Sequence, residues 1–193
     1  MSALIAIVLA YLLGSLSSAI IISKILKTAD PRTAGSGNAG ATNMLRIAGK
    51  RQALLVMIAD ILKGLVAVWI GHLFHMHAFW LGLVAFAAVI GHIFPVYFGF
   101  KGGKGVATAI GATAGLSFLA GILMAAAWGA VALVTRYSSL ASIIAVILAP
   151  IFLLIFAKAI LFIPSALIAA LIIWKHKDNI GRLQNKTETK IEF

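Results

Sequence analysis

Long apolar runs, separated by short polar and glycine-rich segments, dominate the chain. A helix needs roughly 20 consecutive apolar residues to cross the hydrocarbon core of a bilayer. The apolar runs are Ala3–Ser23, Ala53–Phe74, Ala78–Phe98, Val106–Val134, Ser139–Phe156 and Ala159–Trp174. The fourth is too long for one upright helix, so we expect it to form two short helices that turn near Ser117, beside Gly115 and Gly121. The pattern predicts an all-α integral membrane protein with about seven transmembrane helices, the last two hinged near Lys158.

Composition agrees with this class. The chain is 62% hydrophobic and 11% charged, whereas a soluble domain is about 45–50% apolar and about 25% charged. The formal net charge of +11 does not require a nucleic-acid partner, because cytoplasmic loops of membrane proteins carry an excess of Lys and Arg. The chain contains no cysteine, which excludes a disulfide, a thiolate nucleophile and a cysteine-based metal site.

The distribution of basic residues predicts an orientation. With the N-terminus outside, almost every Lys and Arg falls on one side of the membrane, while Lys158 falls on the other and Lys63 lies within a run. The positive-inside rule therefore favours an N-out, C-in topology. We expect a single membrane domain, residues 1–193, with cytoplasmic loops at 24–52 and 99–105 and a cytoplasmic tail at 175–193. Within the first run, Gly14 and Ser18 stand four residues apart, a spacing suited to close helix packing.

The first polar segment runs from Gly35 to Arg46 and contains the pattern G-x-G-x-x-G. No strand precedes it, so a dinucleotide-binding fold is rejected. The segment is nevertheless rich in backbone N–H donors, and its side-chain donors are Ser36, Asn38, Thr42 and Asn43. The guanidinium fork of Arg46 matches the geometry of phosphate oxygens. An anion-binding loop and a surface loop whose glycines merely turn the chain both fit this pattern.

The second polar segment, Gly99–Thr108, places two lysines among four glycines between two apolar runs. Glycines and lysines at the start of a helix make an anion site. The segment is not a Walker A loop, because Gly105 stands where Ser or Thr is required. Lys104 is flanked by glycine on both sides and is well placed to meet a ligand. Lys101 is either a second ligand contact or a lysine that snorkels to the interface.

The third polar segment, Lys175–Leu183, carries His176 and Asn179 three residues apart. These two side chains share a face if the last helix continues. The alternative is a basic tail attracted to anionic lipid. Ser139 and Ser142 begin an apolar run on the same side of the membrane and are further candidates to face the site.

The ionisable residues Asp60, Lys63 and His92 lie well inside the apolar runs. Asp60 and Lys63 are three residues apart and can pair, and both a functional group and a structural ion pair fit them. His92 lies about two turns inside its run, where a buried histidine bonded to a neighbouring helix is favoured over a catalytic one. Neither a G-x-S-x-G elbow nor a His-x-x-x-x-Asp signature occurs, and the five acidic residues are scattered. We therefore expect no metal and no cofactor.

Taken together in this order, the segments resemble the PlsY family of bacterial membrane acyl-phosphate:glycerol-3-phosphate acyltransferases, nearly from end to end. The match includes Tyr11-Leu-Leu-Gly-Ser15, Gly35–Asn43 with Arg46, Asp60-Ile-Leu-Lys-Gly64, Gly91-His-Ile-Phe-Pro95, Phe100–Thr108, and His176 with Asn179 and Arg182-Leu183. The chain departs from the family pattern at Ser17, Lys175 and Lys186, where proline, arginine and glycine are usual.

The resemblance implies transfer of a fatty acyl group from acyl phosphate to the 1-hydroxyl of glycerol 3-phosphate. The products would be 1-acyl-glycerol 3-phosphate (lysophosphatidic acid) and phosphate, as in the first acylation step of phospholipid synthesis. It also implies a multi-pass protein of the bacterial cytoplasmic (inner) membrane, with its active site on the cytoplasmic side and with membrane lipid around it. Neither a metal nor acyl-CoA takes part in this family's reaction.

Carried onto the matched positions, the resemblance implies roles for individual residues. Arg46, Lys104, His176 and Asn179 would hold glycerol 3-phosphate, and Lys104, His176 and Asn179 would be catalytic. The substrate-binding set would comprise Ser36, Gly37, Asn38, Thr42, Arg46, Gly102, Gly103, Gly105 and Ser142. The backbones of Gly35–Thr42 and Gly102–Gly105 would hold the phosphate of the acyl phosphate. Either His176 or a substrate phosphate would accept the proton.

The mechanism favoured by these residues is direct attack. An acyl phosphate is an activated mixed anhydride, and the chain lacks cysteine and a triad motif, so no acyl-enzyme is expected. Two other classes remain open at this stage. A transporter for a phosphorylated metabolite would need charge near the bilayer midplane and access to both sides. A non-catalytic binder of lipid head groups would need the basic tail but not two glycine-rich loops.

Overall fold

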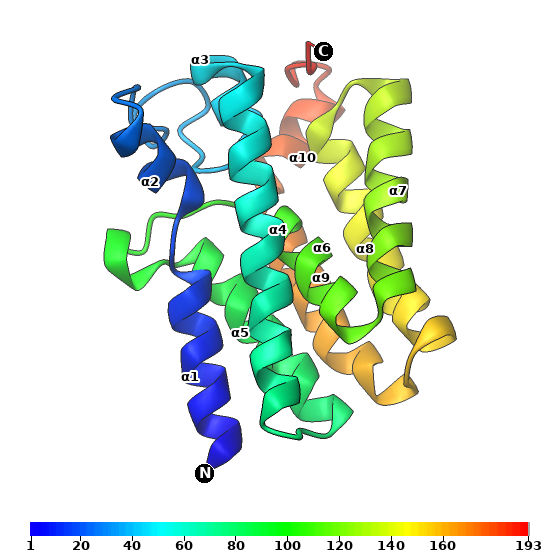
Figure 1. The fold of residues 1–193 in the computed structure, drawn as a ribbon. Helices are drawn as coiled ribbons and strands as arrows, with labels where there is room; N and C mark the ends of the chain where they lie inside the picture. The colour runs from blue at the N-terminus through cyan, green and yellow to red at the C-terminus, as the bar shows by residue number, and fades with distance from the viewer. Residues whose placement is uncertain (193) are drawn as a thin grey trace.

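The computed structural model describes residues 1–192 as a bundle of helices (Figure 1). The elements are α1 (Ser2–Gly14), α2 (Ser18–Ile25), α3 (Ala41–Ala48), α4 (Lys50–Leu73), α5 (Ala78–Ile93), η1 (Val96–Phe98), α6 (Val106–Leu116), α7 (Phe118–Thr135), α8 (Ser138–Phe156), η2 (Ala159–Leu161), α9 (Phe162–Lys175) and α10 (Lys177–Gln184). Every regular element of the described residues is an α-helix or a short 3-10 helix, which confirms the all-α prediction.

Four helical segments are long and apolar enough to cross a membrane, and the number rises to six if each of two bent pairs counts as one span. The four are α4, α5 extended through η1, α7 and α8. The bent pairs are α1 with α2 and the Ala159–Lys175 segment with α10. The eleven-residue α6 is shorter than the roughly 20 residues that a helix needs to span the hydrocarbon. Four to six spans thus follow from length and composition, fewer than the seven predicted.

Two predicted joints are confirmed. The chain turns at Ser117, between α6 and α7, where the Ser117 hydroxyl accepts the N–H of Ala120 at 3.4 Å. Such a side-chain acceptor satisfies one of the free amides at the start of a helix. The second joint follows the end of α8 at Phe156, and Lys158 precedes the short η2.

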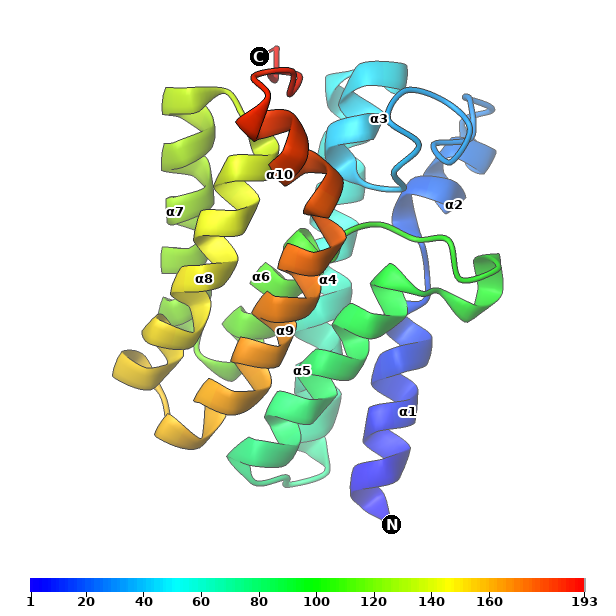
Figure 2. The same ribbon diagram turned by 180° about the vertical axis from the view of Figure 1, so that it is seen from behind.

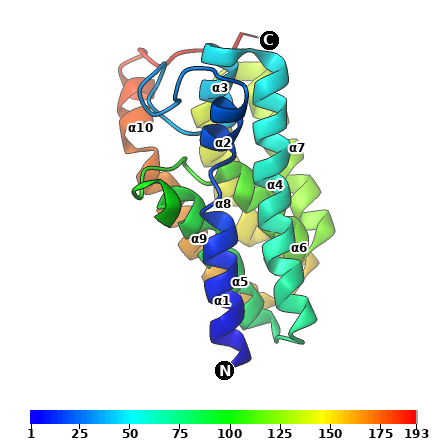
Figure 3. The same cartoon turned by 60° about the vertical axis from the view of Figure 1, so that its left-hand side comes forward.

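The first apolar run, Ala3–Ser23, forms a bent pair of helices that together are long and apolar enough for one span. The chain breaks at residues 15–17, and α2 leaves α1 at an angle of 42° (Figure 3). Polar groups of α4 compensate for the break: Lys63 Nζ donates to the Leu16 carbonyl at 2.9 Å, and Ser18 Oγ donates to Asp60 Oδ1 at 2.8 Å. Gly14 packs against α5, where a Cβ would overlap the Ala88 carbonyl. Ser18 belongs instead to α2 and does not extend the packing face of Gly14.

The contact between α4 and α6 depends on two glycines. A Cβ at Gly64 would overlap the carbonyl of Thr108, and a Cβ at Gly111 would overlap the carbonyl of Ile61. Small residues at such positions let two helix backbones approach closely, which is a common way of packing helices in membranes. The contact fixes α6 against the middle of α4, and it thereby fixes the depth at which α6 begins.

The two termini lie at opposite ends of the bundle (Figure 1). The short helices α2, α3 and α10 lie together at the end that carries the C-terminus (Figures 1 and 2). Residues 99–105, which the sequence predicts to be a loop, connect η1 to α6. The polar segments of the sequence therefore meet at one end of the molecule.

Candidate active site

A cavity of about 400 Å³ lies where the three polar segments meet. Its lining includes every member of the predicted catalytic and substrate-binding sets except Gly103: Ser36, Gly37, Asn38, Thr42, Arg46, Gly102, Lys104, Gly105, Ser142, His176 and Asn179. Asp60, His92, Ser138, Ser139, Arg182 and Glu188 complete much of the polar wall. Met57, Ile61, Ile110 and Trp128 add an apolar part. The cavity thus combines basic and apolar surfaces.

The loop before α3 is shaped by Asn43, which was expected to offer its side chain to a ligand. Instead, Asn43 Oδ1 accepts the N–H of Ser36 at 2.8 Å, and Nδ2 donates to the carbonyls of Pro31 and Ala34 at 2.8 and 3.0 Å. Its side chain is fully buried, so Asn43 orders the loop from within. Gly35 is required beside it, because its φ of +62° is left-handed and a Cβ would overlap Asn43 Oδ1.

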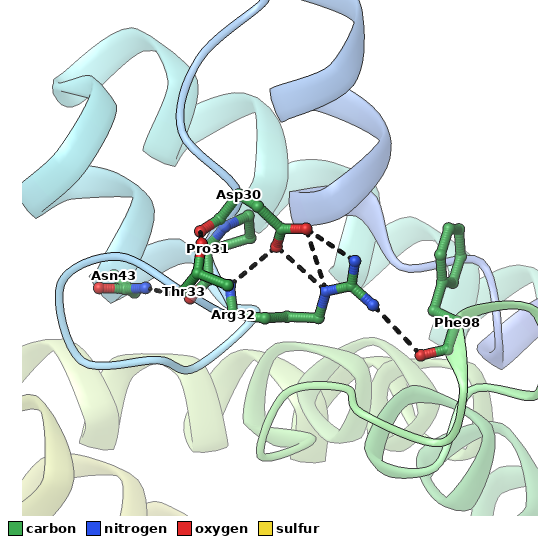
Figure 4. Close-up of polar contacts among 6 residues, drawn as sticks. All are labelled: Asp30, Pro31, Arg32, Thr33, Asn43 and Phe98. Carbon is green, nitrogen blue, oxygen red and sulfur yellow. Dashed lines mark hydrogen bonds and ion pairs between the residues drawn. The ribbon is translucent and has the colours of Figure 1, made fainter.

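Arg32, held by Asp30, links this loop to the segment that precedes the second one (Figure 4). Arg32 Nη2 lies 2.7 Å from Asp30 Oδ2, and Arg32 Nη1 donates to the carbonyl of Phe98 at 3.4 Å. A guanidinium makes such a pair directional, because its planar fork meets a carboxylate with several N–H groups at once. Phe98 ends η1, directly before the loop that carries Lys104.

The Gly102–Gly105 loop rests on His92. Gly103 N–H donates to the His92 carbonyl at 3.2 Å, and a Cβ at Gly103 would overlap the imidazole of His92 and the carbonyl of Ala39. The backbone N–H of Gly103 is therefore engaged inside the protein, and this glycine is absent from the cavity lining. Its expected contact with a phosphate has no support in the geometry, and the close approach to His92 explains why glycine is needed there.

The N-terminus of α6 faces the cavity through Gly105, Val106 and Ala107. Gly105 is left-handed, with φ +91°, and has no side chain to cap the helix. The first N–H groups of a helix carry a partial positive charge and favour anions. Helix α6 thus contributes oriented donors to the same cavity as Lys104.

Lys104 belongs to a chain of polar contacts that closes one side of the cavity. Its ammonium donates to Asn179 Oδ1, and Asn179 Nδ2 donates to Glu188 Oε1 at 2.7 Å. Glu188 also accepts from Ser139 Oγ at 2.9 Å and from Arg182 Nε at 2.7 Å. Burial lowers the pKa of Lys104 to about 8, with the charge of Glu188 opposing the shift. Burial alone would raise the pKa of Glu188, but the hydrogen bonds from Asn179, Arg182 and Ser139 hold it below its usual range.

His176 stands at the joint where α10 leaves α9 at 60°. Its Nδ1 lies 2.8 Å from the Ile172 carbonyl, which can only accept, so Nδ1 carries the proton and Nε2 has a free lone pair. Burial and the charge of Lys104 lower the pKa of His176 to about 4. The ring is therefore neutral near pH 7 and presents Nε2 as a hydrogen-bond acceptor.

Two hydroxyl groups predicted to bind substrate already have protein partners. Ser142 Oγ accepts from Trp128 Nε1 at 3.1 Å and donates to the Ser138 carbonyl at 2.7 Å. Thr42 Oγ1 lies 2.9 Å from Ser138 Oγ. These contacts join α3, α7 and α8 around the cavity. Arg46 is exposed, and within residues 1–192 its side chain makes a single weak hydrogen bond, 3.5 Å to the Thr189 carbonyl.

Sequence reasoning missed Glu188 as a wall of the cavity. The residues after α10 lie back over the bundle: Ile191 is buried, and its N–H donates to the Arg136 carbonyl at 2.7 Å. The available signal was the rarity of acidic residues, since only five accompany 16 basic ones. An acidic residue in a chain with so many basic residues is a candidate for a specific ion pair or hydrogen bond.

These features define a polytopic membrane protein with a basic cavity at one end, the class to which membrane-embedded transferases of phosphate-bearing substrates belong. Residues 4–186 match the family model for glycerol-3-phosphate acyltransferase. Glycerol-3-phosphate acyltransferase from Coxiella burnetii (strain Dugway 5J108-111) is 48% identical over 193 residues, which cover 100% of both chains. The corresponding protein of Shigella flexneri is 49% identical over 185 residues, covering 96% of this chain and 90% of that one.

Two solved structures are similar to the whole chain. The crystal structure of PlsY (YgiH), an integral membrane glycerol 3-phosphate acyltransferase, in its glycerol 3-phosphate form has a TM-score of 0.92 and 42% identity. The lysophosphatidic acid form has a TM-score of 0.91 and 41% identity, and each match covers 100% of this chain and 96% of the other. The chain belongs to the glycerol-3-phosphate acyltransferase family. The resemblance found in the sequence is confirmed.

Proposed function

We propose that the protein transfers a fatty acyl group from an acyl phosphate to the 1-hydroxyl of glycerol 3-phosphate. The hydroxyl oxygen bonds to the acyl carbon, the bond from that carbon to the phosphate oxygen breaks, and inorganic phosphate leaves. The hydroxyl proton passes to a base, and the other product is 1-acyl-glycerol 3-phosphate. This is the first acylation step of phospholipid synthesis.

The main support for this proposal is a single cavity lined by residues from three segments that are distant in sequence. Each of these segments carries groups suited to binding phosphate. Both substrates carry phosphate, and the cavity offers Arg46, Lys104 and the N-terminus of α6 as separate positive groups. Its apolar part, beside Met57 and Ile110, suits an acyl chain that arrives from the bilayer. The family model for glycerol-3-phosphate acyltransferase matches residues 4–186, which supports glycerol 3-phosphate as the acceptor.

The roles of individual residues follow from their positions. Arg46 and Lys104 bind the phosphate of glycerol 3-phosphate, while His176 Nε2 accepts from one of its hydroxyl groups. Asn179 orients Lys104, because its Oδ1 accepts a hydrogen bond from the Lys104 ammonium. Ser36 and Asn38 add side-chain donors at the mouth of the cavity, and the N-terminus of α6, from Gly105 onward, holds the phosphate of the acyl donor. Gly37 and Gly102 shape the two loops, while Thr42 and Ser142 brace α3 and α8 through Ser138.

Positioning supplies much of the rate in this mechanism. An acyl phosphate is already activated, and holding two reactants in line contributes on the order of 7–11 kcal/mol to lowering a barrier. Donors directed at the developing oxyanion and at the leaving phosphate add to this. No acyl-enzyme is required, because the hydroxyl of glycerol 3-phosphate attacks the donor directly.

The proton acceptor is tested by His176→Gln. Glutamine retains an acceptor near the position of Nε2 but is not a base, so near-normal kcat with a raised KM for glycerol 3-phosphate is expected if a substrate phosphate takes the proton. A fall in kcat of about 100-fold or more, with KM unchanged, would assign the proton to His176.

The protein is placed, in this proposal, in the bacterial cytoplasmic membrane with its N-terminus outside and its cavity facing the cytoplasm. The basic residues at the C-terminal end of the bundle support this orientation through the positive-inside rule. In the same arrangement α6 is counted as a seventh, short membrane segment beside α4. Glycerol 3-phosphate then reaches the cavity from water, and the acyl phosphate reaches it from the bilayer.

The decisive experiment is acyl transfer by purified protein. Phosphate release and lysophosphatidic acid formation are followed with acyl phosphate and glycerol 3-phosphate, and equal amounts of the two products are expected. Acyl-CoA replaces the acyl phosphate in a parallel reaction, where no product is expected. Absence of phosphate release, with and without added lipid, would contradict the proposed reaction.

A further inference from the structure

A polar cluster is buried between α2, α4 and α5, next to the cavity. Asp60 Oδ1 lies 2.8 Å from Lys63 Nζ, accepts Ser18 Oγ at 2.8 Å, and lies 3.5 Å from His92 Nδ1. All four side chains are buried, and Asp60 is 2% exposed. Lys63 also donates to the Leu16 carbonyl at 2.9 Å. The cluster therefore joins the break after α1 to the last turn of α5.

The same His92 supports the loop that carries Lys104. Its carbonyl accepts the N–H of Gly103 at 3.2 Å, and its imidazole fills the space where a side chain at residue 103 would lie. Asp60 and His92 both border the cavity. A continuous series of contacts thus runs from Asp60 through His92 and Gly103 to Lys104, the next residue.

Stability alone is a weak explanation for this cluster. Burying a carboxylate and an ammonium carries a desolvation penalty, and apolar residues of similar size are often as stabilising in the same place. An ion pair is, however, directional, and it fixes the side chains around it. His92 Nδ1 has no hydrogen-bond partner in the described structure, so the carboxylate at 3.5 Å is the polar group that faces this side of the ring.

We propose that Asp60 is a positioning residue for the acyl transfer: it holds the His92 ring, which in turn fixes Gly103 and sets the position of the Lys104 ammonium. The inference rests on the proposed role of Lys104 in binding glycerol 3-phosphate. Asp60 itself touches neither substrate. Lys63 balances its charge, and Ser18 fixes the orientation of its carboxylate.

The test compares three variants by the Kd and KM for glycerol 3-phosphate and by the KM for acyl phosphate. Asp60→Asn removes the charge, and Asp60→Leu with Lys63→Leu removes the pair without leaving a lone buried charge. Both are expected to raise Kd and KM for glycerol 3-phosphate roughly 10- to 100-fold, the effect of a displacement on the order of 1 Å. The KM for acyl phosphate is expected to stay within about twofold, because the N-terminus of α6 is fixed separately by α4.

Ser18→Ala and Ser165→Ala form a matched pair. Each removes one buried serine hydroxyl. Ser18 donates a hydrogen bond to Asp60, whereas Ser165 donates one to the Phe162 carbonyl at the start of α9. Ser18→Ala is expected to raise Kd for glycerol 3-phosphate roughly 3- to 10-fold, and Ser165→Ala to leave it unchanged. This pair decides the question if the Asp60 variants do not fold.

Three results would overturn the inference. The first is wild-type Kd in the double leucine variant, which would mean that the pair only neutralises charge. The second is an equal rise in both KM values, which would indicate a general loss of structure. The third is equal behaviour of Ser18→Ala and Ser165→Ala. The wild-type protein serves as the reference throughout: if it fails to transfer an acyl group, the proposed function fails and not the positioning role.

Discussion

Lys104 is the residue whose surroundings depend most on the rest of the fold. Its charge is held in a half-buried site by Asn179, and Glu188 lies on the far side of that amide. A lysine placed this way is a strong phosphate ligand only while it is protonated. Its neighbour Lys101 is exposed and absent from the cavity lining. The two lysines of the second loop thus have different surroundings, although the sequence places them in the same glycine-rich setting.

Lys104→Met is expected to lower kcat/KM for glycerol 3-phosphate about 10- to 100-fold or more, because a hydrogen bond to a charged group is worth about 1.5–3 kcal/mol. Lys101→Met is the matched control and is expected to stay within about twofold of wild type. Steady-state kinetics at several concentrations of glycerol 3-phosphate measure both. Equal losses in the two variants would contradict a specific role for Lys104.

The pKa of Lys104, which burial lowers to about 8, predicts a pH dependence of binding. The ammonium is charged below its pKa and neutral above it, so affinity for a phosphate is lost as the pH rises through about 8. KM for glycerol 3-phosphate is expected to be constant near pH 7 and to increase roughly tenfold per unit above the pKa. Lys104→Arg should remove this inflection, because a guanidinium stays charged. A flat profile up to pH 9.5 in the wild type would contradict the assignment.

At the scale of single elements, the position of α6 is determined by glycines at its contact with α4, because the helix is too short to span the bilayer. Gly64 and Gly111 bring its backbone against α4, and its N-terminus then faces the cavity. Helix α7 offers a contrast in Gly129, around which there is open space. The difference separates glycines that permit a contact from glycines that merely occur in a helix.

Gly111→Ala is expected to destabilise the protein by about 1–3 kcal/mol, because its methyl group would overlap the Ile61 carbonyl. Gly129→Ala is expected to be neutral or to stabilise by up to about 1 kcal/mol, since alanine favours a helix over glycine. Thermal unfolding in detergent measures both. The ranking would be contradicted if Gly129→Ala were the more destabilising of the two.

The elements that the sequence predicted well are those with a local signal. The joints at Ser117 and Lys158 are marked by neighbouring glycines or by a charge between apolar runs. Gly14 also precedes the break at residues 15–17, but the spacing of Gly14 and Ser18 indicated a packing face, and the partners that stabilise the break, Asp60 and Lys63, are more than 40 positions away. Glu188 was missed for the same reason: only the folded chain brings it to Ser139 and Asn179.

At the scale of the whole molecule, the cavity is a meeting point of segments that are distant in sequence. The sequence predicted which residues gather there because one side of the membrane collects the basic and glycine-rich loops. It did not predict which donors are free, since this depends on internal partners such as Asn43 for the first loop and His92 for the second. The gathering of these segments at one end of the bundle is thus readable from the chain, while the hydrogen-bonding capacity that remains free is a property of the fold.

The proposed orientation can be measured by labelling single cysteines, because the chain contains none of its own. Lys101→Cys and Lys158→Cys are suitable, since both positions are exposed and lie in joints between helices. A membrane-impermeant reagent is expected to label Lys158→Cys in intact cells and Lys101→Cys only after the inner membrane is opened. Gly103 is unsuitable, because any side chain there would meet His92. Labelling of Lys101→Cys from outside would contradict the proposed orientation and indicate the opposite one.

The closure of the cavity by Glu188 has a consequence for the biogenesis of the protein. Ribosomes deliver a chain from its N-terminus, so the wall at Ser36 is synthesised long before the wall at residue 188. Until that carboxylate reaches Ser139, Asn179 and Arg182, the cavity lacks one side. The complete cavity is therefore expected only after the last residues have left the ribosome and folded back over the bundle, as one of the final steps of biogenesis.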